Sequence, residues 1–365
     1  MTDREAYVAF NLTDRIGSVG VGELAGRFGG VAAAWEAYEG KVSRSGGEID
    51  AAGEFEKARR YGVRILTPAD DDYPRMLRDT RGHPLALYVK GDVKALSLPS
   101  VAIVGTRRAT VYGLDQANRF AHDLAQSGWC IVSGLALGID CEAHKGALDA
   151  GGKTVGVLGS ALDRFYPEQN RELARNIVKK GGAVVSEFPF GREADQHTFP
   201  QRNHVIAALA SGVLAVESPV KSGTLITAEA AANIGRTVMA VPGRVDSPRS
   251  AGCLKLIREG ATLVRCAADV EEALSELVPK PVERGSVTPS PDRNERRRQP
   301  APAPSFSIEE SMVMRELDAE GVSMDRLVQI TGLSAAKVRS LCMTLRLKER
   351  VRFLPGNRVA LPRGA

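Results

Sequence analysis

Anion-binding groups of the same types recur in three short motifs of this chain. Gly105, Thr106 and Arg107 end the motif VAIVGTR at residues 101–107. Backbone N–H groups at such a turn bind phosphate, and an arginine adds a two-pronged hydrogen-bond donor. The alternative is that Arg107 is a surface ion-pair partner. Two further motifs, which predict two more anion-binding loops, are Ser133 and Gly134 in VSGLALGID (132–140), and Ser222, Gly223 and Thr224 in SGTLIT (222–227).

An aromatic and a basic residue stand close together in a fourth motif, FPQRNHVI at residues 199–206. Phe199 offers a ring face, and Arg202 and Asn203 offer hydrogen-bond donors. Proteins that bind single-stranded nucleic acids without sequence preference combine such base-stacking rings with basic groups. The alternative is that Phe199 belongs to the core and that Arg202 forms an ion pair at the start of a helix.

Two glycine-containing segments and the cysteines do not supply the chemistry that they first suggest. GGKT at residues 151–154 resembles the end of a phosphate-binding P-loop, but Ala147 stands where that motif needs glycine, and a strand follows instead of preceding it. Residues 104–109 have one glycine, too few for a dinucleotide-binding loop. The five cysteines include no Cys-x-x-Cys pair, and no histidine stands at metal-ligand spacing. We therefore expect free thiols and no catalytic residue, cofactor or metal.

Strand-like runs alternate with segments that can form helices between residues 62 and 278. This alternation predicts an α/β fold, an extended Rossmann-like, doubly wound parallel sheet with helices on both faces. Loops at the carboxyl ends of its strands would bring the four motifs to one edge. The runs lie at residues 101–104, 130–132, 155–158, 183–185, 213–216 and 238–241, after two earlier ones within 63–74 and 85–91.

A smaller module is predicted on each side of this domain. Residues 1–61 are expected to be helical, with a glycine-rich turn at 16–22 like those of SAM-like and helix-hairpin-helix modules; a plain turn between helices is the alternative. Residues 279–305 are rich in proline and predict a flexible linker. Residues 306–365 combine helical periodicity with a β-hairpin, as in a winged helix. From Ser334 onward this module has eight Lys/Arg and one Glu, a net charge of +7, which suits either DNA or a protein partner.

The bulk composition is that of a mildly basic globular protein. Its 365 residues suggest two or three domains, and a net charge of +5 with a pI near 8.9 permits a polyanionic partner without requiring one. No apolar run approaches the roughly 20 residues that span a bilayer, and the first residues lack the apolar core of a signal peptide. We therefore expect a cytoplasmic protein without a membrane partner.

The four motifs, together with FYP at residues 165–167, SEFP at 186–189 and VPG at 241–243, resemble the DNA-processing protein A (DprA/Smf) family. The resemblance implies a non-enzymatic protein that binds and protects single-stranded DNA, forms a homodimer through its central domain and loads RecA in natural transformation and recombination. It also implies a DNA-binding groove that contains Gly105, Thr106, Arg107, Ser133, Gly134, Arg202, Asn203, Ser222, Gly223 and Thr224.

One position departs from this family pattern. Family members commonly have arginine where this chain has His204, so a permanent charge is replaced by an imidazole that titrates. A phosphate contact at this position is therefore in doubt, and His204→Arg would be expected to strengthen binding.

A second resemblance suggests an enzyme. Residues 222–229 are similar, at lower specificity, to the motif of nucleotide phosphoribohydrolases described as lysine decarboxylase-like, in which an arginine and a glutamate act on a glycosidic bond. Arg107 and Glu229 would take those roles here. The alternative function is therefore a nucleotide-binding or nucleotide-hydrolysing enzyme.

Overall fold

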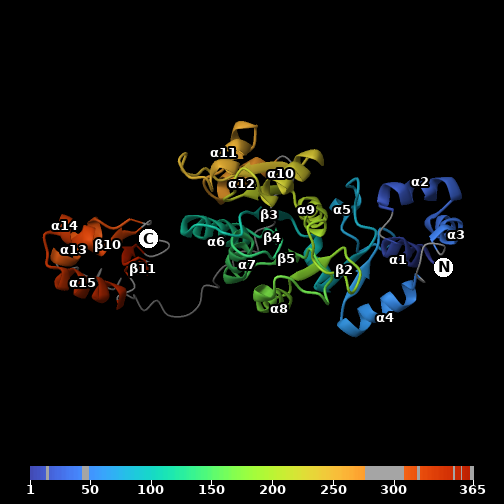
Figure 1. Ribbon diagram of the computed structural model, residues 1–365, viewed down its shortest axis with the longest axis horizontal. Helices are drawn as coiled ribbons and strands as arrows, with labels where there is room; N and C mark the ends of the chain where they lie inside the picture. Colours follow the sequence, from blue (N-terminus) through green and yellow to red (C-terminus); the bar gives the residue numbers. More distant parts are fainter. Residues whose placement is uncertain are drawn as a thin grey trace, which may run out of the picture. The chain divides into compact units, whose positions relative to one another are not determined.

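The computed structural model describes residues 1–13, 16–42, 49–275, 308–318, 321–347, 350–354 and 356–361. The chain forms two compact units, Met1–Val287 and Thr288–Ala365, which Figure 1 colours along the sequence. Residues 279–305, where the linker is predicted, lie outside the described residues. The domain limits drawn from composition stay a prediction.

A nine-stranded sheet, counted over the described residues, occupies the centre of the first unit. Its order is β1-β2-β6-β5-β4-β3-β7-β8-β9. Neighbours from β6 to β9 are parallel, whereas β2 is antiparallel to β6 and β1 to β2. The predicted α/β fold is confirmed. The strands are β1 (Arg64–Leu66), β2 (Leu87–Gly91), β3 (Ser100–Val104), β4 (Cys130–Ser133), β5 (Thr154–Val157), β6 (Ala183–Ser186), β7 (Gly212–Ala215), β8 (Thr237–Ala240) and β9 (Thr262–Leu263).

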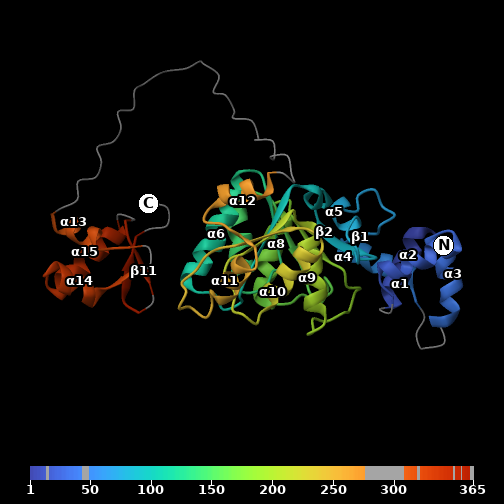
Figure 2. The same cartoon turned by 90° about the horizontal axis from the view of Figure 1, so that it is seen from above.

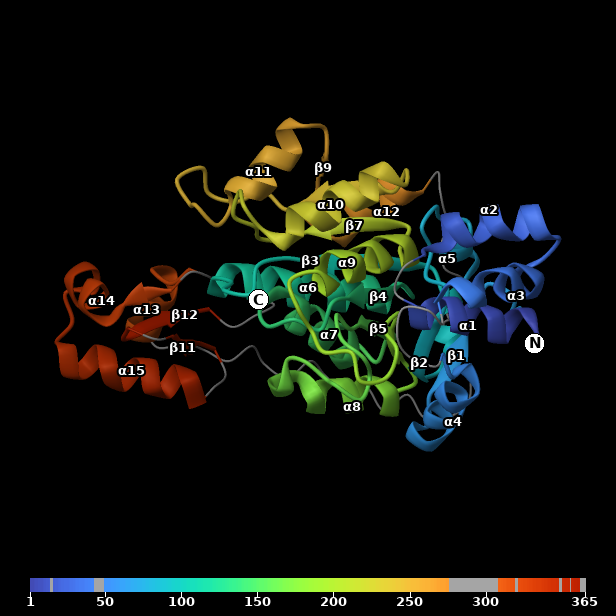
Figure 3. The same cartoon turned by 45° about the vertical axis from the view of Figure 1, so that its right-hand side comes forward.

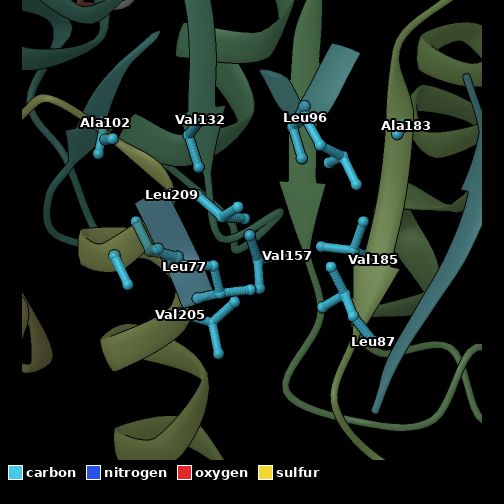
Figure 4. Packing of buried hydrophobic residues seen from close by; sticks show 14 of the residues in the cluster. Leu77, Leu87, Leu96, Ala102, Val132, Val157, Ala183, Val185, Val205 and Leu209 are labelled. Carbon is cyan, nitrogen blue, oxygen red and sulfur yellow. The ribbon is translucent and has the colours of Figure 1, made fainter. Parts of the chain in front are cut away.

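Successive side chains of the strands point into two cores, one on each face of the sheet. Ala102 and Val104 pack with α9 and α10, and Figure 4 shows part of this core around Leu209. Val101 and Ile103 pack with α6, α7 and α12 on the other face. Because both faces are covered, the strands are continuously apolar. The helices of this domain are α5 (Arg75–Arg78), α6 (Val111–Gln126), α7 (Ile139–Asp149), α8 (Arg171–Lys179), α9 (Thr198–Leu209), α10 (Gly223–Asn233), α11 (Ala251–Arg258) and α12 (Ala267–Leu274), with 3-10 turns η2 (Val93–Ser97) and η3 (Glu168–Asn170).

The direction in which the chain adds strands changes between β3 and β7. The chain adds β4, β5 and β6 on one side of β3, and then returns to place β7 and β8 on the other side. Figure 3 shows the two layers, with α9 and α10 on one face of the sheet and α7 and α8 on the other. Loops that leave β3 and β7 at their carboxyl ends therefore diverge, and a crevice opens between them.

Four N-terminal helices pack on the antiparallel edge of the sheet, and Figure 2 shows α4 beside β1. The shared core includes Phe10, Trp35 and Tyr88, and the rings of Phe10 and Trp35 meet edge to face with centroids 5.0 Å apart. This burial joins the helices to the sheet as one unit. The helices are α1 (Asp3–Thr13), α2 (Ser18–Phe28), α3 (Val31–Val42) and α4 (Ala51–Tyr61).

The glycine-rich turn predicted at residues 16–22 is wrong in extent. Helix α2 begins at Ser18, so Gly20 lies inside it. The Ile16 side chain fills the space beside Gly20, because a Cβ added there would lie 2.7 Å from Ile16 Cγ1. The helix ends at Gly29, whose φ of 82° is the left-handed conformation that glycine adopts most readily.

The second unit is a winged helix, as predicted. Three helices pack around a core that includes Val313, Leu327 and Leu345, and residues 332–334 connect the second helix to the third. A three-stranded sheet in the order β10-β12-β11 forms the wing, with Asn357 in the left-handed region at φ 57°. Its elements are α13 (Ile308–Arg315), β10 (Val322–Ser323), α14 (Met324–Thr331), α15 (Ala335–Leu347), β11 (Arg352–Leu354) and β12 (Arg358–Ala360).

Helices in the described parts of both units are either too short or too polar to cross a membrane.

Candidate nucleic-acid interface

A cavity of about 350 Å³ lies where the loops after β3 and β7 diverge. The sequence predicts a site at this edge, because ligands of open α/β sheets bind where the strand order reverses. Loops from three strands and the first turns of α9 and α10 enclose the cavity. Its lining is Val104, Gly105, Thr106, Arg107, Arg108, Ala136, Asp140, Phe199, Arg202, Asn203, Ile206, Pro219, Lys221, Ser222, Gly223, Thr224 and Thr227.

Most of the predicted site residues line this cavity. The two that do not are Ser133, the last residue of β4, and Gly134, which follows it. Gly134 borders a smaller adjoining hollow, whereas Ser133 is fully buried and donates its hydroxyl to the carbonyl of Ile103 at 2.6 Å. The predicted residues in the lining are Gly105, Thr106, Arg107, Phe199, Arg202, Asn203, Ser222, Gly223 and Thr224.

The loop after β3 is held in place by Glu217, two residues beyond the end of β7. The Glu217 carboxylate accepts hydrogen bonds from the backbone N–H of Thr110 at 2.8 Å and from its hydroxyl at 2.9 Å. The Glu217 carbonyl accepts from the N–H of Thr106 at 2.8 Å. Three hydrogen bonds from one buried residue therefore fix the loop that carries Arg107.

A close approach of two backbones sets the distance between the loops after β3 and β4. Gly138 has a φ of 80°, and a Cβ at this position would collide with the carbonyl oxygens of Thr106 and Arg107. Glycine is therefore required here for both conformation and space. This contact explains one glycine of the motif at residues 132–140.

Arg107, at the mouth of the cavity, is exposed and free to bind an anion. Its guanidinium lies 4.7 Å from the centroid of the Phe199 ring. Within the described chain, the Arg107 side chain has no hydrogen bond or ion pair, and neither do those of Arg108 and Lys221, which are also exposed. Three exposed cations that form no ion pair within the described structure thus surround the entrance, which favours a polyanionic ligand.

Arg202 forms part of the cavity wall but is only 6% exposed. It donates through Nη1 to the carbonyls of Gly134 and Val157, the latter at 2.8 Å, and through Nε to Asn203 Oδ1 at 3.1 Å. Burial lowers the pKa of its guanidinium to about 10, although the Asp140 carboxylate opposes that shift. Arg202 therefore connects the ends of β4 and β5. The alternative drawn from the sequence is an ion pair of Arg202 at the start of a helix; in the structure Arg202 instead donates hydrogen bonds to backbone carbonyls.

Asp140 occupies the backbone N–H groups that the sequence assigns to a phosphate. Its Oδ2 accepts from the N–H of Gly134 at 3.1 Å and of Ala136 at 3.4 Å. Burial raises the pKa of Asp140, while the charge of Arg202 and these two hydrogen bonds lower it. The loop after β4 is thus filled by the protein's own carboxylate. In the loop after β3 the N–H of Thr106 is likewise bonded, to the Glu217 carbonyl, so the part of that loop open to a ligand is the exposed Arg107 side chain.

The first turn of α10 is the second open anion site. Ser222 precedes the helix in an extended conformation, and no side chain caps the first turn. The Ser222 hydroxyl bonds instead to that of Ser218 at 2.6 Å, and Asn203 Nδ2 donates to the Gly223 carbonyl at 3.3 Å. The uncapped N–H groups and the helix dipole face the cavity and attract a negative charge.

Phe199 stands at the rim of the cavity, half-buried against Gly159. Its ring is also 6.2 Å from that of Tyr166 between centroids, at an angle of 52°. Tyr166, Asp140, Arg108 and Lys221 border the cavity or its adjoining hollow and are not among the site residues that the sequence predicts. Asp140 and Tyr166 stand inside quoted motifs, and Arg108 and Lys221 directly adjoin them, so proximity to the motifs was the available signal.

His204 does not line the cavity. It lies half-buried on α9, and its Nε2 is 3.7 Å from the place where Gly82 would carry a Cβ. Burial lowers the pKa of the imidazole. The stronger binding expected of His204→Arg is therefore not supported, because the side chain faces residue 82 and not the ligand.

Both units of the chain match known protein families. Residues 64–275, which contain all nine strands of the central sheet, match the family described as DNA recombination-mediator protein A. The chain belongs to this family. Residues 297–357 also match the winged helix domain described for DprA, in agreement with the fold of the second unit.

Relatives of this chain in the DNA recombination-mediator protein A family include named proteins and solved structures. Protein Smf of Synechocystis is 33% identical over 83% of this chain and 81% of its own length. DprA of Streptococcus pneumoniae is 40% identical over 60% of this chain and 74% of its own. The crystal structure of that DprA covers 74% of this chain and 98% of its own, with a TM-score of 0.63 and 33% identity.

A second solved structure belongs to DNA processing protein A of Helicobacter pylori. It covers 59% of this chain and 96% of its own, with a TM-score of 0.53 and 29% identity. That structure is described as showing a single-stranded DNA binding mode. Both comparisons agree with the Rossmann-like architecture observed here.

Proposed function

We propose that this chain binds single-stranded DNA at the cavity between β3 and β7, protects it and loads RecA onto it in recombination and natural transformation. The observation that carries the proposal is Arg107, an exposed cation that forms no ion pair within the described structure and is held over the Phe199 ring at 4.7 Å. A phosphate would neutralise Arg107, and a base would stack nearby. The proposal includes a homodimer and a cytoplasmic location.

The shape of the site favours a single strand over a duplex. A duplex presents its phosphates outward and keeps its bases stacked inside, so an aromatic ring at the rim of a cavity gains no base contact. A single strand can place a phosphate at the first turn of α10 and a base at Phe199 at the same time. The RecA step rests on membership in a family of recombination mediators.

The enzymatic alternative requires Glu229 and Arg107 to act on one nucleotide. Glu229 lies on α10, is exposed and is not part of the cavity lining. The carboxylate that does line the cavity, Asp140, is engaged by two backbone N–H groups. These positions support a binding function without catalysis. Release of ribose phosphate from AMP by the purified chain would support the alternative instead.

The decisive experiment compares single- and double-stranded oligonucleotides of equal length by fluorescence anisotropy over a series of salt concentrations. We expect preference for the single strand, no requirement for ATP, and a salt dependence that counts the neutralised phosphates. A RecA nucleation assay on strands coated with single-strand-binding protein then tests loading. Equal affinity for the duplex would reject the proposal.

A further inference from the structure

We propose that Tyr166 and Leu137 form a second base-binding subsite next to Phe199, which takes an unpaired nucleobase of the bound strand. The inference rests on the proposed function and adds a ligand subsite to it. Tyr166 follows β5, and Leu137 follows β4, so the two residues approach from neighbouring strand ends. Together they border a hollow of about 30 Å³ beside the main cavity.

Two large apolar side chains are exposed at this hollow without a role in the folded core. Tyr166 is 50% exposed and Leu137 is 39% exposed. The core contact of the Tyr166 loop is made by its neighbour Phe165, which packs with Leu135 and is covered by the Arg171 guanidinium at 5.2 Å. Tyr166 is therefore not needed to anchor its own loop.

The two rims of the hollow are fixed to each other before any ligand binds. Asn170, just after the Tyr166 loop, donates its amide to the carbonyls of Leu135 at 2.8 Å and Ala136 at 3.1 Å. Leu135 is a buried non-glycine residue with a φ of 52°, a conformation that costs free energy and persists only where its surroundings enforce it. This turn leaves Leu137 exposed at the rim. Rigid apolar rims reduce the entropy lost when a flat ligand binds.

The hollow is continuous with the proposed DNA site. Arg107, Ala136, Phe199 and Arg202 line both the hollow and the main cavity. A hollow of about 30 Å³ is too small to enclose a base, so the base would lie across its mouth with one face on the exposed Tyr166 ring. Its phosphate would then lie near the Arg107 guanidinium. This positive charge favours a nucleotide over an apolar peptide as the ligand, because a peptide without acidic groups would not bind to it.

The relative tilt of the two rings selects an unstacked strand. The Tyr166 and Phe199 rings are inclined by 52° with centroids 6.2 Å apart. Two bases that lie flat on these rings cannot remain stacked on each other, so the strand must bend between them. A duplex would have to lose stacking and pairing to do the same, which adds discrimination against it.

The test is a cycle that combines Tyr166→Ala with an abasic nucleotide. The probe is the shortest oligodeoxythymidylate that saturates the site, with one abasic residue moved along it. We expect Tyr166→Ala to weaken binding of the intact strand roughly 5- to 150-fold, the range for one stacked base. When the abasic residue stands at the position that contacts Tyr166, the wild-type chain should lose as much affinity as the Tyr166→Ala substitution causes. The Tyr166→Ala variant should lose no further affinity for that abasic strand. Tyr166→Phe should bind as the wild type.

Tyr61→Ala provides the matched control, because Tyr61 is equally exposed, at 50%, but lies at the end of α4 and stacks on Phe190. It should leave affinity unchanged. Photocrosslinking of the wild-type chain to 5-iodouracil-substituted strands should label Tyr166, and this arm does not depend on the folding of a variant. If the wild type binds single strands but Tyr166→Ala binds equally well and Tyr166 is not labelled, the subsite is rejected and the proposed function stands. If the wild type does not bind single strands, both the subsite and the proposed function are rejected.

Discussion

Arg107 and Arg202 both lie near the Phe199 ring, but Arg107 is exposed to solvent and Arg202 is buried. Their guanidinium carbons lie 4.7 and 5.9 Å from the Phe199 centroid, respectively. Arg107 is exposed and has no polar partner in the described structure, whereas Arg202 is buried and bonded to carbonyls. A change at Arg107 should therefore act on binding, and a change at Arg202 should act mainly on folding.

Arg107→Ala should weaken binding of single-stranded DNA by about 1–3 kcal/mol and reduce the salt dependence by about one phosphate, because it removes a charge-assisted contact. The melting temperature should fall only slightly, since the side chain loses an exposed cation–π contact with Phe199 but no hydrogen bond or ion pair of the described structure. Anisotropy titrations and thermal melts measure both. Arg258→Ala is the control, because Arg258 is exposed at the end of α11, at the opposite edge of the sheet.

Arg202→Met should lower the free energy of unfolding by about 3 kcal/mol or more. The substitution leaves the carbonyls of Gly134 and Val157 without their buried donor and removes the positive charge near Asp140. Urea denaturation measures the change. A variant that melts normally yet loses DNA binding would show that Arg202 serves the ligand directly.

His144 should make the fold sensitive to acid. It is fully buried and bonds through Nδ1 to Thr154 Oγ1 at 2.6 Å, and burial lowers its pKa from 6.5 to about 3. Between these values the unfolded chain binds a proton that the folded chain does not, so this contribution to stability is present above pH 6.5 and is lost as the pH falls. The loss should be about 1.4 kcal/mol per pH unit.

The measurement for His144 is the free energy of unfolding at several pH values between 7 and 4, for the wild type and for His144→Gln. Carboxylates contribute to acid unfolding in both chains, so the informative quantity is the difference between them. That difference should shrink as the pH falls. Parallel pH profiles for the two chains would contradict the assignment.

At the scale of elements, the uncapped first turn of α10 should bind a phosphate. Gly223→Asp would place a carboxylate there, which stabilises a helix N-terminus by about 0.3–1 kcal/mol but repels a phosphate. We expect unchanged or improved thermal stability together with weaker DNA binding, and the binding defect should diminish at high salt. Gly223→Ala is the matched control, because its Cβ would lie an ordinary 3.8 Å from Asn203 Nδ2. Normal binding by Gly223→Asp would exclude a phosphate at this turn.

The elements and the edge that carries the site could be predicted from the sequence, because buried parallel strands are continuous apolar runs. Each of the six runs in the central domain ends within one residue of a strand end. The two-residue β9 has too little pattern to be recognised. Gly20 was misread because a glycine that packs against Ile16 inside a helix has the same local sequence signal as a turn.

The orientation of individual side chains could not be predicted in this way. Whether the Arg202 guanidinium is exposed to a ligand or bonded to backbone carbonyls depends on the rotation of α9 about its axis, which tertiary packing sets. Asp140 was missed because its role depends on a loop that folds back to present the N–H groups of Gly134 and Ala136. Residue types at strand ends therefore predicted which loops would enclose the cavity, whereas its internal hydrogen bonds required the structure.

At the scale of the whole molecule, the two compact units should function separately in strand binding. A chain ending at Pro279 keeps the sheet, its cores and the complete cavity lining. This shortened chain should fold and bind single strands, which fluorescence anisotropy measures. On our proposal it should also form a dimer, which analytical sedimentation measures. If most of the affinity disappears, the winged helix with its +7 stretch carries the main DNA contact.

The three hydrogen bonds of Glu217 have a consequence for binding kinetics. The loop that carries Arg107 is held at Thr106 and Thr110 in the absence of DNA, so the strand meets an entrance that is already formed. Encounter should then be governed by diffusion and charge, with no slow rearrangement of the protein. Substitutions of uncharged residues at the entrance would accordingly shorten the time that a strand remains bound far more than they would slow its arrival, whereas loss of a cation there would also slow arrival.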